Sequence, residues 1–213
     1  MSKNQKNNKE PLHSELKINN PQISQILNQS ADLGFFTKES IIHYDSVDYE
    51  KESIEHTDNK NLAHYKEHNI KLKCNTFGDD TPGGIYFYNK LVPIIGEGYE
   101  GPRTSLYNPK GHIGWHKDNA YQTYLIAFAY CVEKPDGFYS WEDSETGKIH
   151  TIKDVPGWTC RSSVHLDQDI SEWHAIKTNT PRIVLGFTYP NYKDFLKAKE
   201  IVQSDKYNYY ETI

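Results

Sequence analysis

The segment Gly111–Val132 reads GHIGWHKDNAYQTYLIAFAYCV and contains two predicted strands. The first is Gly114–Asp118, which follows a turn. The second is Tyr124–Val132, a continuous apolar run whose length suits a buried strand. Side chains two residues apart on a strand point to the same face. His116 and Asp118 therefore place an imidazole and a carboxylate side by side on the first strand.

Further short strands are predicted on both sides of this segment, each bounded by turn residues such as Pro135–Gly137 and Asp154–Gly157. They are Ile70–Cys74, Ile85–Tyr88, Thr104–Tyr107, Phe138–Trp141, His150–Ile152, Trp158–Val164, Trp173–Ile176 and Ile183–Tyr189. Turn signals recur about every 8 to 12 residues, which is typical of a sandwich, barrel or jelly roll. The sequence therefore predicts a mainly β fold with flanking helices.

The ends of the chain differ from this β-rich part. Residues 1–20 are rich in Asn and Lys with few large apolar groups, which predicts a disordered tail. Residues 21–213 are predicted to form one domain. Apolar side chains at helical spacing predict helices over Pro21–Asn28 and Tyr192–Val202. Loops are predicted at residues 44–70, which are polar, and at Ile94–Pro102, which is rich in glycine.

Composition excludes several classes of protein. The 213 residues carry a formal net charge of −5, which argues against a general nucleic-acid coat protein. No apolar run is long enough for a membrane span, and the polar N-terminus is not expected to be a signal peptide. The 3 cysteines lie in unrelated contexts, so we expect reduced thiols and a cytoplasmic protein.

Three side chains on two predicted strands suggest a metal site. His116 and Asp118 are joined by His174, which lies in a later strand. Two histidines and one carboxylate on one side of a metal ion form the facial triad of non-haem Fe(II) oxygenases. A His-x-Asp triplet alone is common, but Arg182 follows on the next strand and gives it weight. Because Arg182 comes directly after Pro181 and opens an apolar strand, it is predicted to point inward to a buried partner.

The order His116-x-Asp118, His174, Arg182 resembles that of the Fe(II)- and 2-oxoglutarate-dependent dioxygenases, over about residues 70–190. The resemblance implies a double-stranded β-helix, a variant of the jelly roll. It also implies that His116, Asp118 and His174 ligate iron and carry the catalysis. Two other histidines, near the motif strands, are not expected to be ligands; they are His112 and His165.

The resemblance further implies how 2-oxoglutarate would be held. Arg182 would pair with the distal carboxylate of 2-oxoglutarate, for which the planar guanidinium is well suited. Tyr107, on the strand before the motif, would donate a hydrogen bond to the same co-substrate. Tyr124, on the strand after the motif, competes for that role. Packing in the core is the alternative for either tyrosine.

The activity implied is that of an oxidoreductase using Fe(II), 2-oxoglutarate and O2, with ascorbate as an accessory reductant, and releasing succinate and CO2. We favour hydroxylation of a protein or peptide side chain, as in prolyl hydroxylases, whose distal histidine is also followed by a basic residue at a similar spacing. A small-molecule substrate stays open, because loops set specificity.

Three other functions are weighed against this one. The segments around Tyr107 and Gly114–Asp118 are somewhat AlkB-like, which suggests oxidative demethylation of nucleic acid. However, no arginine follows Arg182, and the acidic net charge weighs against such a substrate. A metal hydrolase could use the same three ligands with a bound water, but it would give Arg182 no task. A metal-binding jelly roll without 2-oxoglutarate turnover is the third. The sequence does not determine the oligomeric state.

Overall fold

The computed structural model of the chain describes residues 12–32, 75–77, 82–96, 102–107, 112–117, 123–131, 134–165 and 173–206. The strands in this part are β1 (His13–Leu16), β2 (Asn75–Phe77), β3 (Pro102–Tyr107), β4 (His112–His116), β5 (Thr123–Cys131), β6 (Gly137–Glu142), β7 (Ile149–Lys153), β8 (Trp158–His165), β9 (His174–Thr178) and β10 (Arg182–Tyr189). The helices are α1 (Pro21–Asp32), α5 (Pro82–Ile95) and α6 (Tyr192–Gln203). Within these ranges no helix combines the length and apolar character needed to cross a membrane.

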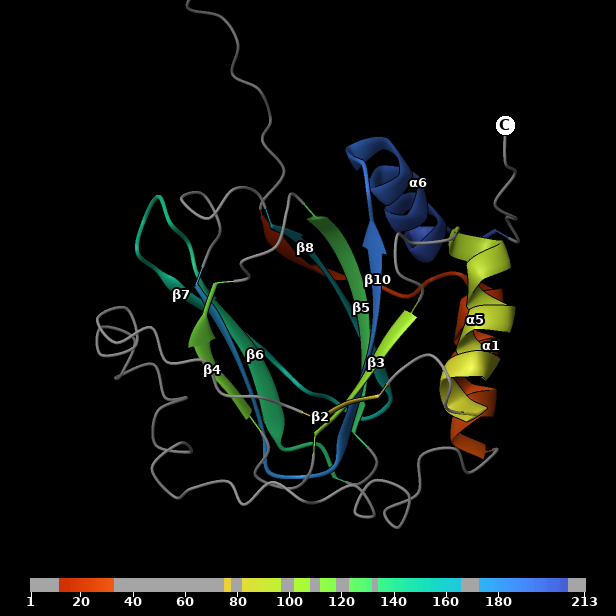
Figure 1. The fold of residues 1–213 in the computed structure, drawn as a ribbon, viewed down its shortest axis with the longest axis horizontal. Helices are drawn as coiled ribbons and strands as arrows, with labels where there is room; N and C mark the ends of the chain where they lie inside the picture. The colour runs from red at the N-terminus through yellow and green to blue at the C-terminus, as the bar shows by residue number, and fades with distance from the viewer. Residues whose placement is uncertain are drawn as a thin grey trace, which may run out of the picture.

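The strands form two antiparallel sheets that face each other (Figure 1). The larger sheet has the order β1-β8-β5-β10-β3-β2, and the smaller has the order β4-β9-β6-β7. From β3 onward the chain passes from one sheet to the other at each step, except at the β6–β7 hairpin. This strand order is that of a double-stranded β-helix, so the predicted fold class is confirmed.

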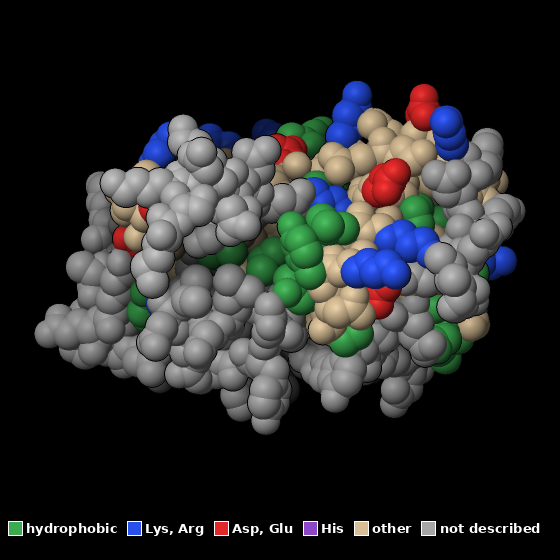
Figure 2. Space-filling view, turned by 90° about the horizontal axis from the view of Figure 1, so that it is seen from above, with side chains coloured by type: hydrophobic (Ala, Val, Ile, Leu, Met, Phe, Trp, Pro, Cys, Tyr) green, Lys and Arg blue, Asp and Glu red, His purple; other side chains and the backbone are tan. Residues whose placement is uncertain are grey.

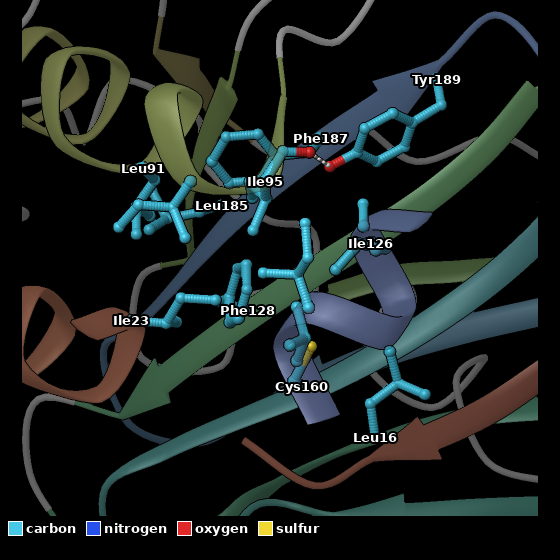
Figure 3. Close-up of a cluster of buried hydrophobic side chains, with 14 of the residues drawn as sticks. Leu16, Ile23, Leu91, Ile95, Ile126, Phe128, Cys160, Leu185, Phe187 and Tyr189 are labelled. Carbon is cyan, nitrogen blue, oxygen red and sulfur yellow. Dashed lines mark hydrogen bonds between the residues drawn. The ribbon is translucent and has the colours of Figure 1, made fainter. Parts of the chain in front are cut away.

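The three helices cover the outer face of the larger sheet (Figure 1). Strand β10 shows how alternation divides the two faces, because its odd-numbered residues from Ile183 to Tyr189 join the helix-side core. Phe128 and Phe187 meet edge to face in that core, with ring centroids 6.0 Å apart. The Tyr189 hydroxyl donates to the Ile95 carbonyl (3.1 Å), which ties β10 to the end of α5 (Figure 3).

A second, smaller core fills the space between the two sheets. Its buried members are Tyr107, Ala127, Ala129, Tyr139, Ile176 and Val184. On β5 this inner face carries alanines, whereas the helix side of the same strand carries Ile126 and Phe128. Small side chains therefore line the inner face of the central strand at Ala127 and Ala129, whereas Leu125 packs at its edge.

The N-terminal segment departs from the sequence prediction. Residues 12–20 are ordered, so the predicted disordered tail is wrong for them; residues 1–11 lie outside the described part. Strand β1 pairs with β8, where the Ser14 and Ser162 hydroxyls are hydrogen-bonded at 2.8 Å. Leu16 is buried in the helix-side core. Composition did not indicate this strand, because backbone pairing with a sheet edge needs few apolar side chains.

Helix α5 also departs from the prediction, which placed a strand at Ile85–Tyr88 and a loop from Ile94. The tyrosines and phenylalanine there favour strands, but Phe87, Leu91 and Ile94 have helical spacing and are all buried. The helix ends at Gly96, whose φ of 86° is left-handed and whose N–H donates to the Val92 carbonyl (2.9 Å).

The helices predicted near the two ends of the domain are confirmed by α1 and α6. Helix α6 is capped by Asn191, whose side chain accepts a hydrogen bond from the Asp194 N–H (3.0 Å). The predicted loop at 44–70 and the predicted strand at Ile70–Cys74 lie outside the described residues.

Candidate functional site

His174 opens β9 on the inner face of the smaller sheet. The strand register aligns it with His116 of β4 on one side and Trp141 of β6 on the other. An irregularity in the pairing between Ile113 and His116 shifts the register just before this row. The two predicted histidine ligands therefore occupy directly opposed positions on neighbouring strands.

Aromatic rings enclose the His174 imidazole, which is buried with 5% of its surface exposed. The ring of Tyr139 and the ring of His13 each have their centroid 5.8 Å from that of His174. His13, from β1, shares a 2.8 Å hydrogen bond between its Nδ1 and the Tyr139 hydroxyl. The Arg161 guanidinium lies 3.5 Å above the Tyr139 ring, a cation–π contact.

The structure describes only part of the predicted metal-binding triad. Asp118 and the side chain of His116 lie outside what the structure describes, so their role as ligands stays a prediction. The two tryptophans before the predicted histidine ligands pack on the outer face of the smaller sheet. There Trp115 is fully buried beside Ala175, and Trp173 packs against them. Alternation thus turns His174 inward and its neighbours outward.

Arg182 opens β10 on the inner face of the larger sheet, directly opposite Tyr107 of β3 and Cys131 of β5. It is 1% exposed and points inward to a buried partner, as predicted. That partner is Asp154, whose two carboxylate oxygens accept hydrogen bonds from Arg182 Nε at 2.9 and 3.2 Å. The thiol of Cys131 donates to the same carboxylate at 3.3 Å. Burial, together with the nearby Asp154 charge, raises the pKa of Cys131 to about 12.

The rest of the Arg182 guanidinium is less fully bonded. Its Nη1 atom is buried and has no hydrogen-bond partner among the residues that the structure describes. The Tyr107 ring lies beside it, with its centroid 5.8 Å from the guanidinium carbon. A buried N–H without an acceptor is costly, so an oxyanion placed at Nη1 would be stabilised.

The structure brings one of the two candidate tyrosines to Arg182. Tyr107 is 2% exposed and shares the inner face with Arg182. Tyr124 lies on the helix side of the sheet and at the far end of β10, opposite Tyr189. There its ring packs on Tyr192 and Phe195, with centroids 5.4 and 5.6 Å away. Its surroundings are those of a packing residue.

Sequence reasoning missed two residues of this region. The sequence predicts a turn at Asp154–Gly157, and nothing in it links Asp154 to Arg182. His13 falls in the predicted disordered tail. Only the pairing of β1 with β8 places it between the sheets.

Charges are mixed on the face seen from above. In Figure 2 the described Lys and Arg side chains (blue) and Asp and Glu side chains (red) are interspersed around apolar groups. A stripe of basic residues is the usual mark of a nucleic-acid surface. The described part of this face does not show one.

This chain can be compared with known proteins by its fold and not by its sequence. No protein-family model matches the sequence, and the search of curated proteins found no similar sequence. A prolyl-4-hydroxylase from Pseudomonas putida overlaps at 10% identity and a TM-score of 0.44, covering 85% of this chain and 94% of that one. A viral collagen prolyl hydroxylase from Paramecium bursaria Chlorella virus-1 overlaps at 11% identity and 0.40, covering 83% and 94%. A rice dioxygenase for auxin oxidation overlaps at 10% identity and 0.37, covering 84% and 73%. With overlaps this loose, the fold assignment rests on the strand order itself.

Proposed function

We propose that this chain is an Fe(II)- and 2-oxoglutarate-dependent oxygenase that hydroxylates a protein or peptide side chain. The observation that carries the proposal is the buried Arg182, whose Nη1 lacks an acceptor in the described part of the chain. It lies on the inner face of one sheet, and His174 lies on the inner face of the other. Both faces border the same interior, so the two groups suit the two ends of one ligand.

The residue types in the sequence suit both implied groups. His116, Asp118 and His174 would hold the iron, a donor set suited to Fe(II). Arg182 would donate to the distal carboxylate of 2-oxoglutarate, with the Tyr107 ring alongside. When bound, iron together with 2-oxoglutarate and O2 would supply the oxidising chemistry.

The protein's own contribution is orientation and exclusion of water. The hydrogen bond between Tyr139 and His13 fixes two rings next to His174. Val184 and Ile176 close the space between the sheets with apolar surface. Directed donors in a dry site bind charge more strongly than the same donors in water.

The proposal is tested by succinate formation. Full-length protein with Fe(II), ascorbate, O2 and 2-oxoglutarate should release succinate, and His174→Ala should abolish this release. His150→Ala is a matched control, because His150 stacks on Trp141 at 5.1 Å but belongs to β7, two strands away from β9. Equal turnover in His174→Ala would refute the proposal.

The substrate class is tested by stimulation of the same release. Peptides should stimulate succinate formation, whereas methylated oligonucleotides should not. Stimulation by oligonucleotides would favour the AlkB-like alternative instead. A metal-loaded protein that never consumes 2-oxoglutarate would be a metal-binding jelly roll or a hydrolase.

A further inference from the structure

The carboxylate of Asp154 holds Arg182 by one edge. The side chains of this ion pair are 2% and 5% exposed, so it is almost fully removed from solvent. Asp154 follows directly after β7, and its N–H donates to the Gly137 carbonyl at 2.9 Å. This backbone hydrogen bond anchors Asp154 at the start of β6. From there its carboxylate reaches Arg182, the first residue of β10.

Gly137 makes this approach possible. A Cβ atom on Gly137 would collide with Asp154 Oδ2, and it would lie 2.8 Å from the Lys177 carbonyl oxygen. Real Cβ atoms almost never come that close to another atom, so a larger residue would shift both the Asp154 carboxylate and the Lys177 backbone. Glycine at position 137 therefore leaves open the space that the Asp154 carboxylate occupies.

Two further contacts define how the guanidinium is turned. Both hydrogen bonds to Asp154 come from Nε, and Cys131 caps the same carboxylate with its thiol. Nη1 is left buried and without an acceptor within the described ranges. A carboxylate that merely competed with a ligand would be expected to occupy the Nη edge. Asp154 leaves at least part of that edge unbonded.

We propose that Asp154 is a positioning residue, which turns Arg182 so that its Nη edge faces the interior and can receive a ligand carboxylate. The identity of that ligand as a dicarboxylate rests on the proposed function. Asp154 cancels the charge of Arg182, so net charge contributes little to holding an anion there. Directed hydrogen bonds from the guanidinium supply the attraction, and their direction depends on Asp154.

Variants that keep the charge but move the carboxylate separate positioning from competition. Asp154→Glu lengthens the side chain by one methylene. Gly137→Ala pushes the native carboxylate aside and also presses on the Lys177 backbone, so Asp154→Glu is the cleaner of the two variants. If Asp154 positions Arg182, both changes weaken binding. If it competes with the ligand, both strengthen it. Asp143→Glu is the control, because Asp143 lies in the exposed β6–β7 turn and accepts hydrogen bonds from the Glu145 and Thr146 N–H groups.

The measurement uses the arginine side chains themselves. The chain has three arginines (Arg103, Arg161 and Arg182), so arginine labelled with nitrogen-15 should give three Nε–H signals. Arg182→Lys assigns the relevant one. Glutarate is the probe, since it carries two carboxylates but lacks the keto group that would bind a metal. We expect the Arg182 signal to shift on titration, with the midpoint raised about tenfold in Asp154→Glu, as is typical when an orienting partner is lost. Asp143→Glu should match the wild type.

Thermal unfolding of each variant shows whether it is folded, and Gly137→Ala provides the test if Asp154→Glu does not fold. The inference would be overturned if the midpoint of the glutarate titration were unchanged or lowered in the folded variants. It would also be overturned if the Arg182 signal of the wild type did not shift when glutarate is added. The proposed function fails separately: a wild type that binds glutarate at Arg182 but forms no succinate would remove the oxygenase and leave the role of Asp154.

Discussion

The buried pair of Asp154 and Arg182 allows a quantitative prediction of stability. Asp154→Asn leaves the Arg182 charge, with 2% of its side chain exposed, without a counter-charge. Breaking a buried pair in this way costs about 3–5 kcal/mol. Arg182→Met has a similar expected cost of about 3–5 kcal/mol, because it leaves the buried Asp154 carboxylate without a counter-charge. In the described part of the chain, the Cys131 thiol would then be the remaining side-chain donor to that carboxylate.

The double variant Asp154→Asn/Arg182→Met removes both charges together. An apolar replacement of a buried pair is often neutral, and the buried amide left behind costs about 1–3 kcal/mol. We therefore expect the double variant to be more stable than either single variant. The two single effects should exceed the double effect by about 3 kcal/mol or more, which is a strong coupling.

Urea denaturation followed by tryptophan fluorescence measures the free energy of unfolding of all four proteins. A domain of this size has a stability of about 5–15 kcal/mol, so the single variants can still fold at low temperature. Additive losses, with the double variant the least stable, would mean that Asp154 and Arg182 do not form this buried pair. Asp143→Asn, at an exposed turn, should lie close to the wild type.

Four further predictions concern the core, the reactivity of the buried thiols, the dependence of stability on pH and the end of α5. Phe128→Ala, at a fully buried position on the helix side of β5, should lower the free energy of unfolding by about 3–5 kcal/mol. Ile85→Ala, at a residue that is 49% exposed, should change it by less than about 0.5 kcal/mol in a urea titration. Cys131 and Cys160 should resist alkylation at pH 8 in the native protein and react in urea, as read by peptide mass spectrometry, because burial raises the pKa of both thiols. The pKa of Cys131 is about 12 in the native protein against an ordinary 9.0, so the protonated thiol stabilises the fold fully below pH 9 and this stabilisation is lost as pH rises toward 12. The free energy of unfolding should therefore fall with pH in that window, and it should fall less in Cys131→Ala. Gly96→Ala should cost about 1 kcal/mol, because the φ of 86° that ends α5 strains any residue with a Cβ; no loss in thermal unfolding would contradict this reading of the cap.

Most strands were predictable from the sequence because turn residues separate short runs of apolar, β-branched and aromatic residues. From Ile183 to Tyr189 the odd residues are buried against the helices, and the predicted strand differs from β10 by one residue. The failures have separate physical causes. At α5 the strand propensity of Tyr and Phe competed with helical spacing, and packing against α1 and α6 decided the outcome. At β1 the stabilisation comes from backbone pairing, which leaves little mark on composition.

The burial of two candidate site residues was predictable because each belongs to a recognisable strand. His174 and Arg182 each open a strand, and both are buried as expected for groups on an inner face. Asp154 was not predictable. It reaches Arg182 across 28 residues of sequence and depends on a glycine in a third segment. The choice between Tyr107 and Tyr124 required the register, because the two lie on opposite faces of one sheet and at opposite ends of β10.

The oxygenase proposal requires one metal-dependent 2-oxoglutarate site between the sheets, bounded by His174 and Arg182. This requirement can be measured by equilibrium dialysis of radiolabelled 2-oxoglutarate against the full chain with Mn(II), which does not turn the co-substrate over. We expect one molecule bound per chain. Binding should depend on the metal, be lost in His174→Ala, be weakened in Arg182→Met and be unchanged in His150→Ala. The proposed site would be contradicted by 2-oxoglutarate binding that does not depend on the metal. It would also be contradicted by binding that is unchanged in both His174→Ala and Arg182→Met.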